Sequence, residues 1–287
     1  MGAIFRHELR NYFHSLTAYV FGAFLLAVVG LGSVLYNLQA AVSNFEFVLS
    51  FASIIFVVIV PILTMRTLAE ERRQRTDQLL YSLPITTTQV VLGKYFALLV
   101  VYLIPLAVIS LYPLLFSQFG DVYLPTSYGS LFAFFMMGAA LLAVGMFLSS
   151  LTDNQGFAAG IGIAAILLNY YSVSLAEYTS STAMGSLIAL YVIALLLGVV
   201  IHNLTRNENL AYGVTLVLIA ALSVAYFVNS SAFEGLLPDI MTKLSLFRQF
   251  NSFVNGAFDL TAIVYYVSVM GFFLFLSVQS MEKRRYN

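Results

Sequence analysis

Charge-free apolar runs of about 20 residues are the feature that most constrains the fold of this chain. A helix needs about that length to cross the roughly 30 Å hydrocarbon core of a membrane. Eight such runs occur, at about residues 17–38, 46–66, 95–116, 128–150, 156–176, 184–203, 210–229 and 260–281, and Glu46 and Arg66 stand at the two ends of the second. In lipid only helices or closed barrels satisfy their backbone groups, and continuous apolar runs select helices. We therefore predict an all-α polytopic membrane protein with a single transmembrane domain over residues 1–287.

The composition agrees with a lipid environment. Hydrophobic residues make up 61% of the chain and charged residues only 9%, whereas about 25% of the residues of a soluble domain are charged. The chain has no Cys, which excludes disulfides and Cys metal sites. Its formal net charge of zero gives no reason to expect a nucleic-acid partner.

The basic residues predict the orientation in the membrane. With the N-terminus inside, most of the 13 Lys and Arg residues fall on the cytoplasmic side, namely Arg6, Arg10, Arg66, Arg72, Arg73, Arg75, Lys94, Arg206, Lys283, Arg284 and Arg285. Only Lys243 and Arg248 fall outside. This is the positive-inside pattern, and an even number of spans returns the C-terminus to the cytoplasm.

The first sixteen residues are too polar for the apolar core of a signal peptide. They carry a helical apolar stripe of Phe5, Leu9, Tyr12, Phe13 and Leu16. We predict that residues 1–16 form an amphipathic helix lying on the inner leaflet before the first span. A solvated N-terminal tail is the alternative.

Residues 66–94 form the main charged segment of the chain, with 8 of its 26 Asp, Glu, Lys and Arg residues. Glu70, Glu71 and Arg72 belong to a charged helical extension of the second span. Leu79, Leu80 and Leu83 form a short apolar ridge, which Pro84 ends. The spacing from Thr86 to Gln89 is that of a capping box and predicts the start of the next helix.

This segment resembles the loop between the second and third spans of the ABC-type-2 permease superfamily, the membrane subunits of ATP-driven exporters. The matching residues are Glu70, Glu71, Arg72, Thr76, Leu79, Leu80, Leu83, Pro84, Gly93 and Lys94. The pattern departs at two positions: Arg75 stands at the usual Gly position and Gln78 at a position where an acid is common. A second match, residues 244–260 before the last span, is similar to the gliding-motility-type and nitrous-oxide-reductase-maturation-type permeases of that superfamily.

The resemblance implies a transporter subunit that is not itself an enzyme. Residues 67–94 would then form a cytoplasmic coupling loop that docks on an ABC ATPase, and residues 1–16 the family's elbow helix. Two copies of the ATPase and a second permease, identical or related, are the implied partners, in the cell membrane of a prokaryote. ATP and Mg would bind the partner ATPase, and no cofactor is expected in this chain. Six spans are the alternative to eight, because the simplest members of the superfamily have six.

Residues 230–259 are predicted to form one or two amphipathic helices on the outer surface, with Gly256 after a helix end and Asp259 as the N-cap of the last span. This segment either closes the outer exit of a transport path or merely covers the bundle. Asn169, Tyr170, Tyr171 and Ser172 form the densest polar cluster in an outer half-span. They either line a path or pack between helices.

The sequence predicts no catalytic and no metal-binding residues. Gly93-Lys94 lacks a Gly at position 88 and is followed by Tyr95, so it is not a phosphate-binding loop. The docking pattern could alternatively be a solvated charge run that anchors at the membrane surface.

Two other function classes remain open. A secondary transporter or channel would usually place ionisable groups within the bilayer, but no predicted span has one in its middle, and Glu46 and Glu177 lie at outer ends where water is expected to reach them. A membrane scaffold for assembly of an envelope complex is the second alternative.

Overall fold

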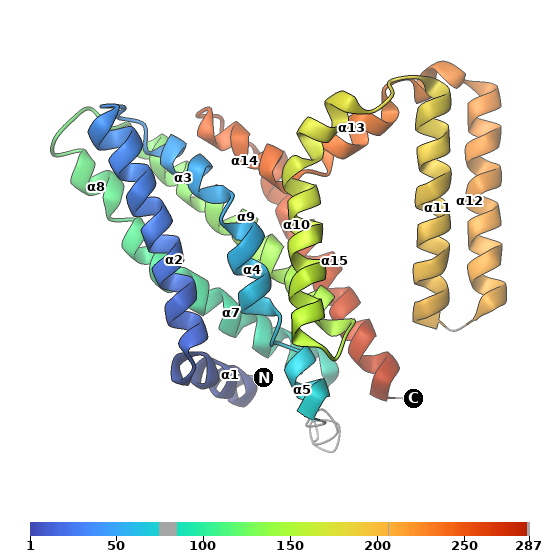
Figure 1. The fold of residues 1–287 in the computed structure, drawn as a ribbon, viewed down its shortest axis with the longest axis horizontal. Coiled ribbons are helices and arrows are strands. Elements are labelled where there is room, and N and C mark those ends of the chain that lie inside the picture. The colour runs from blue at the N-terminus through green and yellow to red at the C-terminus, as the bar shows by residue number, and fades with distance from the viewer. Residues whose placement is uncertain (75–84, 206, 286–287) are drawn as a thin grey trace. The chain divides into compact units, whose positions relative to one another are not determined.

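The protein is described by a computed structural model that covers residues 1–74, 85–205 and 207–285, and all regular elements in these ranges are helices (Figure 1). The chain forms two compact units. The first comprises Met1–Tyr170 and Gln249–Asn287, and the second comprises Tyr171–Arg248.

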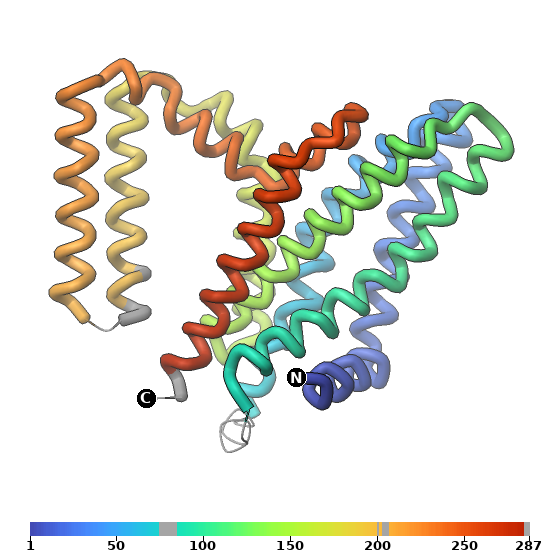
Figure 2. The backbone as a smooth tube through the Cα atoms, turned by 180° about the vertical axis from the view of Figure 1, so that it is seen from behind, coloured from blue at the N-terminus to red at the C-terminus, as the bar shows by residue number. Residues whose placement is uncertain are grey.

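The first unit is a bundle whose long helices run side by side (Figure 2). Its helices are α1 (Gly2–His14), α2 (Leu16–Ser33), the π-helix η1 (Val34–Gln39), α3 (Phe45–Ser53), α4 (Phe56–Thr64), α5 (Ala69–Gln74), α7 (Thr87–Ile109), α8 (Tyr112–Phe116), α9 (Leu124–Ser150) and α15 (Leu260–Arg285). Two further helices, α10 (Gln155–Tyr178) and α14 (Leu246–Val254), run across the boundaries between the units.

Helix α9 lies at the centre of this unit. In its apolar window 72% of the residues are buried, and it packs against α3, α4, α7 and α15. Small residues allow the close approach: a Cβ atom at Gly138 would lie only 2.6 Å from the ring of Tyr102. The Tyr102 hydroxyl also donates to the carbonyl of Phe134 at 2.8 Å. Small residues at helix contacts and internally satisfied polar groups are what a bundle in lipid requires.

The structure confirms that each of the eight predicted runs is helical. Among the described residues, six helices are long and apolar enough to cross a membrane: Leu16–Gln39, Thr87–Phe116, Leu124–Ser150, Gln155–Tyr178, Glu208–Val228 and Leu260–Lys283. The described apolar part of α11, Ala183–Val199, is shorter. The structure therefore supports a multi-pass membrane protein, while eight spans remain a prediction.

The second predicted span is not one straight helix. Its two parts, Phe45–Ser53 and Phe56–Gln74, are bent by 58° at the break between them. If the pair counts as one span, the number of candidate spans rises to seven. No Gly or Pro stands at the break itself, and Pro61 lies further along the chain, inside α4.

The expectation that water reaches Glu46 is wrong. Glu46 is 1% exposed, and its Oε1 accepts a hydrogen bond from Ser127 Oγ at 3.2 Å. Neighbouring α9 covers this end of α3, which a hydropathy pattern could not reveal. A buried carboxylate in a membrane protein is expensive and is therefore a functional hypothesis in itself.

The second unit contains an antiparallel helix pair, α11 (Ala183–Thr205) and α12 (Glu208–Val228), followed by the short helices η2 (Ser230–Phe233) and α13 (Leu236–Lys243). The Tyr191 and Ser223 hydroxyls lie 2.7 Å apart across the pair. Most of the large apolar side chains of α12 are exposed, among them Leu216 (66%) and Val217 (68%). In a membrane protein such faces are suited to contact with lipid.

The segment 230–259 is helical as predicted, with α13 and α14 as its two amphipathic helices. The aromatic side chains of Phe250 and Phe253 are buried. Gly256 follows α14 with a left-handed φ of 81°, and Asp259 Oδ1 accepts from the Thr261 N–H at 2.8 Å. The predicted helix end and N-cap are thus confirmed.

Candidate functional site

The candidate site lies at the end of the bundle where α1, α5 and the start of α7 meet. Helix α1 ends at His14, and Ser15 is extended (φ −96°, ψ 159°) and caps α2 by accepting from the Thr17 N–H. The chain therefore turns sharply, and α1 lies across the lower end of the bundle in Figure 1. Gly93 permits its contact with α7, because a Cβ atom there would lie 3.1 Å from Ile4.

Burial on α1 follows four of the five residues of the predicted apolar stripe, because Tyr12 is buried and Phe5, Leu9 and Phe13 are half-buried. The buried residues of this helix are Glu8 and Tyr12, whereas Leu16 lies beyond the helix end and is 78% exposed. Ile4, Glu8 and Tyr12 are spaced four residues apart and therefore share the face that meets the protein. Burial, reinforced by the Glu8 carboxylate, raises the pKa of the Tyr12 phenol well above its usual value.

A buried ion-pair cluster joins the three helices. Lys94 Nζ of α7 lies 2.7 Å from Glu8 Oε1 of α1 and 2.6 Å from Glu71 Oε1 of α5. The Lys94 side chain is 2% exposed, compared with 11% for Glu8 and 22% for Glu71. A buried ammonium is costly unless it is paired and hydrogen-bonded, so the cluster holds all three helices in place.

Ser149 of α9 fixes the turn between α4 and α5. Its hydroxyl oxygen accepts from the backbone N–H groups of Leu68 at 3.3 Å and Ala69 at 3.2 Å, and its O–H donates to the carbonyl of Met65 at 3.1 Å. The backbone groups at this break in helix are thereby satisfied inside the protein, as burial requires. The direction in which α5 leaves the bundle is therefore set by α9.

The C-terminal end of α15 contributes two further contacts. Arg72 of α5 is 8% exposed, and its Nη2 donates to Ser280 Oγ at 3.4 Å. Thr87 Oγ1, at the start of α7, donates to Glu282 Oε1 at 2.7 Å. Thr86 caps α7 by accepting from the Gln89 N–H, so the predicted helix start is confirmed. Residues on both sides of the segment 75–84 are thus tied to the bundle.

The structure describes three of the eight predicted coupling residues. Glu71 and Arg72 point into intramolecular contacts, whereas Glu70 is half-buried and accepts from Gln74 Nε2 at 3.3 Å. The other five, which carry the predicted apolar ridge and its end, lie outside the described residues: Thr76, Leu79, Leu80, Leu83 and Pro84.

The polar cluster predicted to line a path lies elsewhere. Asn169, Tyr170, Tyr171 and Ser172 are all in α10, and Tyr171 is 46% exposed. None of the four lines the cavity described below. Their role in a transport path remains a prediction.

Sequence reasoning missed Glu8 and Ser149. Glu8 carries a signal, since it lies on the same helix face as Ile4 and Tyr12, and a lone acid on a packed face needs a cation. Ser149 has no such signal in the sequence, because a serine near a helix end is common and its hydrogen-bond partners are 80 or more residues away in the chain.

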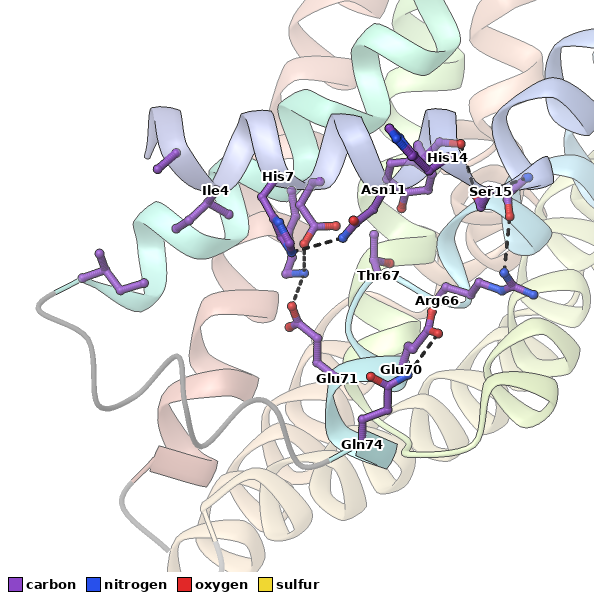
Figure 3. Close-up of a pocket in the computed structure, with 16 residues that line it drawn as sticks. Ile4, His7, Asn11, His14, Ser15, Arg66, Thr67, Glu70, Glu71 and Gln74 are labelled. Carbon is purple, nitrogen blue, oxygen red and sulfur yellow. Dashed lines mark hydrogen bonds and ion pairs between the residues drawn. The ribbon is translucent and has the colours of Figure 1, made fainter.

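A cavity of about 720 Å³ lies beside the cluster (Figure 3). Its lining includes Ala3, Ile4, His7, Glu8, Asn11, Tyr12, His14, Ser15, Thr17, Arg66, Thr67, Glu70, Glu71, Gln74, Ile85 and Lys94. The lining residues come from α1, the start of α2, the turn before α5, α5 itself and the start of α7. The arrangement can hold a polar ligand and can transmit a displacement of α5 to α1.

Comparison with known proteins gives one family. A family model described as ABC-2 family transporter protein matches residues 27–176, just over half of the chain. The matched range runs from within α2 to within the last turn of α10 and includes Glu71 and Lys94, but not Glu8. Searches of curated proteins and of solved structures gave no match.

Proposed function

The chain belongs to the ABC-2 family of transporter proteins and is a multi-pass membrane permease, and from that premise we propose that it couples ATP hydrolysis by a separate ATPase subunit to export. The family implies an ABC ATPase as partner. The coupling element in this proposal is residues 67–94. The residues that we assign to coupling with the ATPase are Glu70, Glu71, Arg72, Thr76, Leu79, Leu80, Leu83 and Pro84.

The ion-pair cluster is the observation that supports this coupling role. Glu71 precedes the segment 75–84 and Lys94 follows it, and both belong to one cluster with Glu8 of α1. A force applied between these two anchors reaches α1, α5 and α7 together, because none of the three can move away without separating buried opposite charges. Both described ends of the segment are thus connected to the bundle, as the transmission of a force requires.

In our proposal the two described carboxylates of this segment, Glu70 and Glu71, have different roles. Glu71 forms an ion pair with Lys94 and acts as a positioning residue. Glu70 makes only a local hydrogen bond to the Gln74 side chain among the described residues, so its charge can attract a basic surface on the ATPase. Leu79, Leu80 and Leu83 would supply the apolar contact.

The complete transporter in this proposal contains two ATPase subunits and a second permease, identical or related. ATP and Mg bind the ATPase subunits. Both termini lie in the cytoplasm, α1 is the elbow helix on the inner leaflet, and the cell membrane is prokaryotic. As ATP draws the two ATPase subunits together, substrate passes between the two permease bundles or is extracted laterally, and Asn169, Tyr170, Tyr171 and Ser172 line part of that path.

The buried Glu46 favours a second candidate function, that of a secondary transporter driven by an ion gradient. Glu46→Gln distinguishes the two functions. An ATP-driven permease should keep ATP-dependent transport in this variant, whereas a gradient-driven carrier should lose its dependence on the coupling ion.

The test of the coupling role is reconstitution with the ATPase in lipid, followed by measurement of complex yield, ATP hydrolysis and substrate movement. Glu70→Arg should lower the complex yield by reversing the attraction, while Lys243→Glu, a charge reversal outside this segment, should not. The pair Leu79→Asp and Leu80→Asp should abolish assembly, since it places charges in a desolvated contact.

Pro84→Ala should separate attachment from energy transmission. Without the proline the helix can extend and change its angle to α7, so we expect binding to survive while hydrolysis no longer drives transport. Wild-type behaviour of all these variants would contradict the coupling assignment.

A further inference from the structure

The cavity beside the ion-pair cluster carries two opposite charges that the cluster does not use. Arg66 Nη1 donates to Thr17 Oγ1 at 3.5 Å, and no carboxylate in the described ranges lies within ion-pair distance of this guanidinium. Glu70, four residues later, accepts a hydrogen bond from Gln74 Nε2 but forms no ion pair with a cation in the described ranges. Figure 3 shows both side chains on the same side of the cavity.

The net charge of the lining argues against a purely anionic ligand. Arg66 and Lys94 are opposed by Glu8, Glu70 and Glu71, so the acids outnumber the bases when the histidines are neutral. Lys94 already forms ion pairs with the carboxylates of Glu8 and Glu71. A ligand that complements this lining therefore has one negative and one positive group.

An exposed apolar stripe leads away from the cavity. Leu16 stands between the lining residues Ser15 and Thr17 and is 78% exposed. Val20 (43% exposed) and Phe24 (56%) follow at four-residue spacing, which places them on the same face of α2. Since α2 is a candidate membrane span, this stripe offers a path for an acyl chain that begins at the rim of the cavity.

We propose that the cavity binds the headgroup of a zwitterionic phospholipid with a primary ammonium, of the phosphatidylethanolamine type. The phosphate lies against Arg66 and Thr17, the ammonium lies against Glu70, and an acyl chain follows Leu16, Val20 and Phe24. The volume of about 720 Å³ is within the usual range for small-molecule sites. Glu70 also carries the proposed contact with the ATPase, so lipid binding is measured on the permease without the ATPase and does not depend on coupling.

The lining favours a primary over a quaternary ammonium. Glu70 and the side-chain carbonyl of Gln74 accept hydrogen bonds, which a primary ammonium donates and a quaternary ammonium cannot. Quaternary ammonium groups are typically bound by aromatic cages of Trp, Tyr or Phe, and Tyr12 is the one residue of these three types among the described residues of the lining.

The experiment measures lipid binding to the purified full-length protein in detergent micelles. Phosphatidylethanolamine, phosphatidylcholine and phosphatidylglycerol with identical acyl chains are titrated, and bound lipid is counted by native mass spectrometry. Phosphatidylethanolamine should bind about tenfold more tightly than the other two, as expected for the loss of a charge-assisted hydrogen bond. Equal binding of the three lipids, or preference for phosphatidylglycerol, would overturn the proposal.

Side-chain variants locate the site. Arg66→Gln and Glu70→Gln should each weaken phosphatidylethanolamine binding by about tenfold, and Arg66→Lys and Glu70→Asp should restore part of it. Arg10→Gln is the matched control, because Arg10 is an exposed arginine of α1 that does not line the cavity. If Arg10→Gln weakens binding as much as Arg66→Gln, general surface charge explains the binding and the site is wrong.

Free ligands distinguish a lipid from a soluble source of the same chemistry. Glycerophosphoethanolamine carries the same phosphate and ammonium without acyl chains, and inorganic phosphate carries only the anion. Both should compete at least a hundredfold less well than the lipid, because they bury no apolar surface on α2. Competition by glycerophosphoethanolamine at equal concentration would overturn the lipid assignment.

Discussion

Lys94 Nζ of α7 lies 2.7 Å from the Glu8 carboxylate of α1, although the two residues are 86 positions apart in the chain. Glu71 meets the same ammonium from the other side at 2.6 Å. The Gly-Lys pair at the start of the third predicted span thus has two physical functions. Gly93 makes room for α1, and Lys94 then holds α1 and α5 in place.

Removal of the central cation should destabilise the protein. Lys94→Met removes the cation that both the Glu8 and the Glu71 carboxylates contact, and we expect a loss of about 3–5 kcal/mol in the free energy of unfolding. Glu8→Gln should cost less, because Lys94 keeps Glu71 and the amide oxygen can still accept. Thermal unfolding in detergent measures both.

The control for this prediction is the exposed pair of Lys243 and Asp239. It has a similar N–O distance of 2.7 Å, but its side chains are 70% and 50% exposed. Lys243→Met should therefore change stability by about 0–1 kcal/mol. Equal losses for Lys94→Met and Lys243→Met would show that the buried cluster contributes no more than a surface pair.

A side chain at position 93 should displace α1. A Cβ atom there would lie 3.1 Å from Ile4, and the larger Gly93→Val should cost about 1–3 kcal/mol by overpacking. Gly129→Val, in a helix where a Cβ atom would meet nothing within 4 Å, should be nearly neutral. Protease access at residues 1–16 measures the displacement, and unchanged access in Gly93→Val would contradict it.

The sequence predicted the helices well because each depends on local hydropathy and caps. The Thr86 cap, the Gly256 turn and the Asp259 cap were all readable from single residues and their neighbours. The third predicted span begins at residue 95, within α7, and the helix itself begins at Thr87, next to the Thr86 cap that predicted its start. The sequence assigned Lys94 to the cytoplasmic side, and in the structure this residue is paired with two carboxylates from other helices.

The partners of the site could not be predicted from local pattern. The resemblance marked Glu71 and Lys94 as parts of a loop that docks on an ATPase, but it gave no sign that these two residues form an ion pair with each other. Long-range pairs such as Glu8 with Lys94 and Glu46 with Ser127 depend on which helices are neighbours in space. Hydropathy specifies that a helix is buried but not which helix covers it.

Loss of the Ser149 hydroxyl should release the turn before α5. In Ser149→Ala the N–H groups of Leu68 and Ala69 lose their buried acceptor, which should cost about 1–3 kcal/mol in the free energy of unfolding. Ser110→Ala is the control, because the Ser110 hydroxyl is exposed and bonds only a carbonyl one turn away. Hydrogen exchange at Leu68 and Ala69 should rise in the first variant alone.

Site-directed labelling should decide whether α11 and α12 cross the membrane. The chain has no Cys, so single cysteines at Ser82, Gly120, Asn207 and Ser231 can be tested in intact cells with a membrane-impermeant maleimide. The charge asymmetry predicts that Gly120→Cys and Ser231→Cys react from outside, while Ser82→Cys and Asn207→Cys react only after the cells are opened.

The Asn207→Cys result decides between six and eight membrane spans. Asn207 is exposed and caps α12 by accepting from the Leu210 N–H, so it lies at the connection between the two helices. Protection from the external reagent would mean that α11 crosses despite its short described apolar stretch, and that α12 crosses back. Labelling from outside would instead mean that neither helix crosses. The chain would then have six spans, formed by α2, the bent pair α3 and α4, α7, α9, α10 and α15, and the prediction of eight would be wrong.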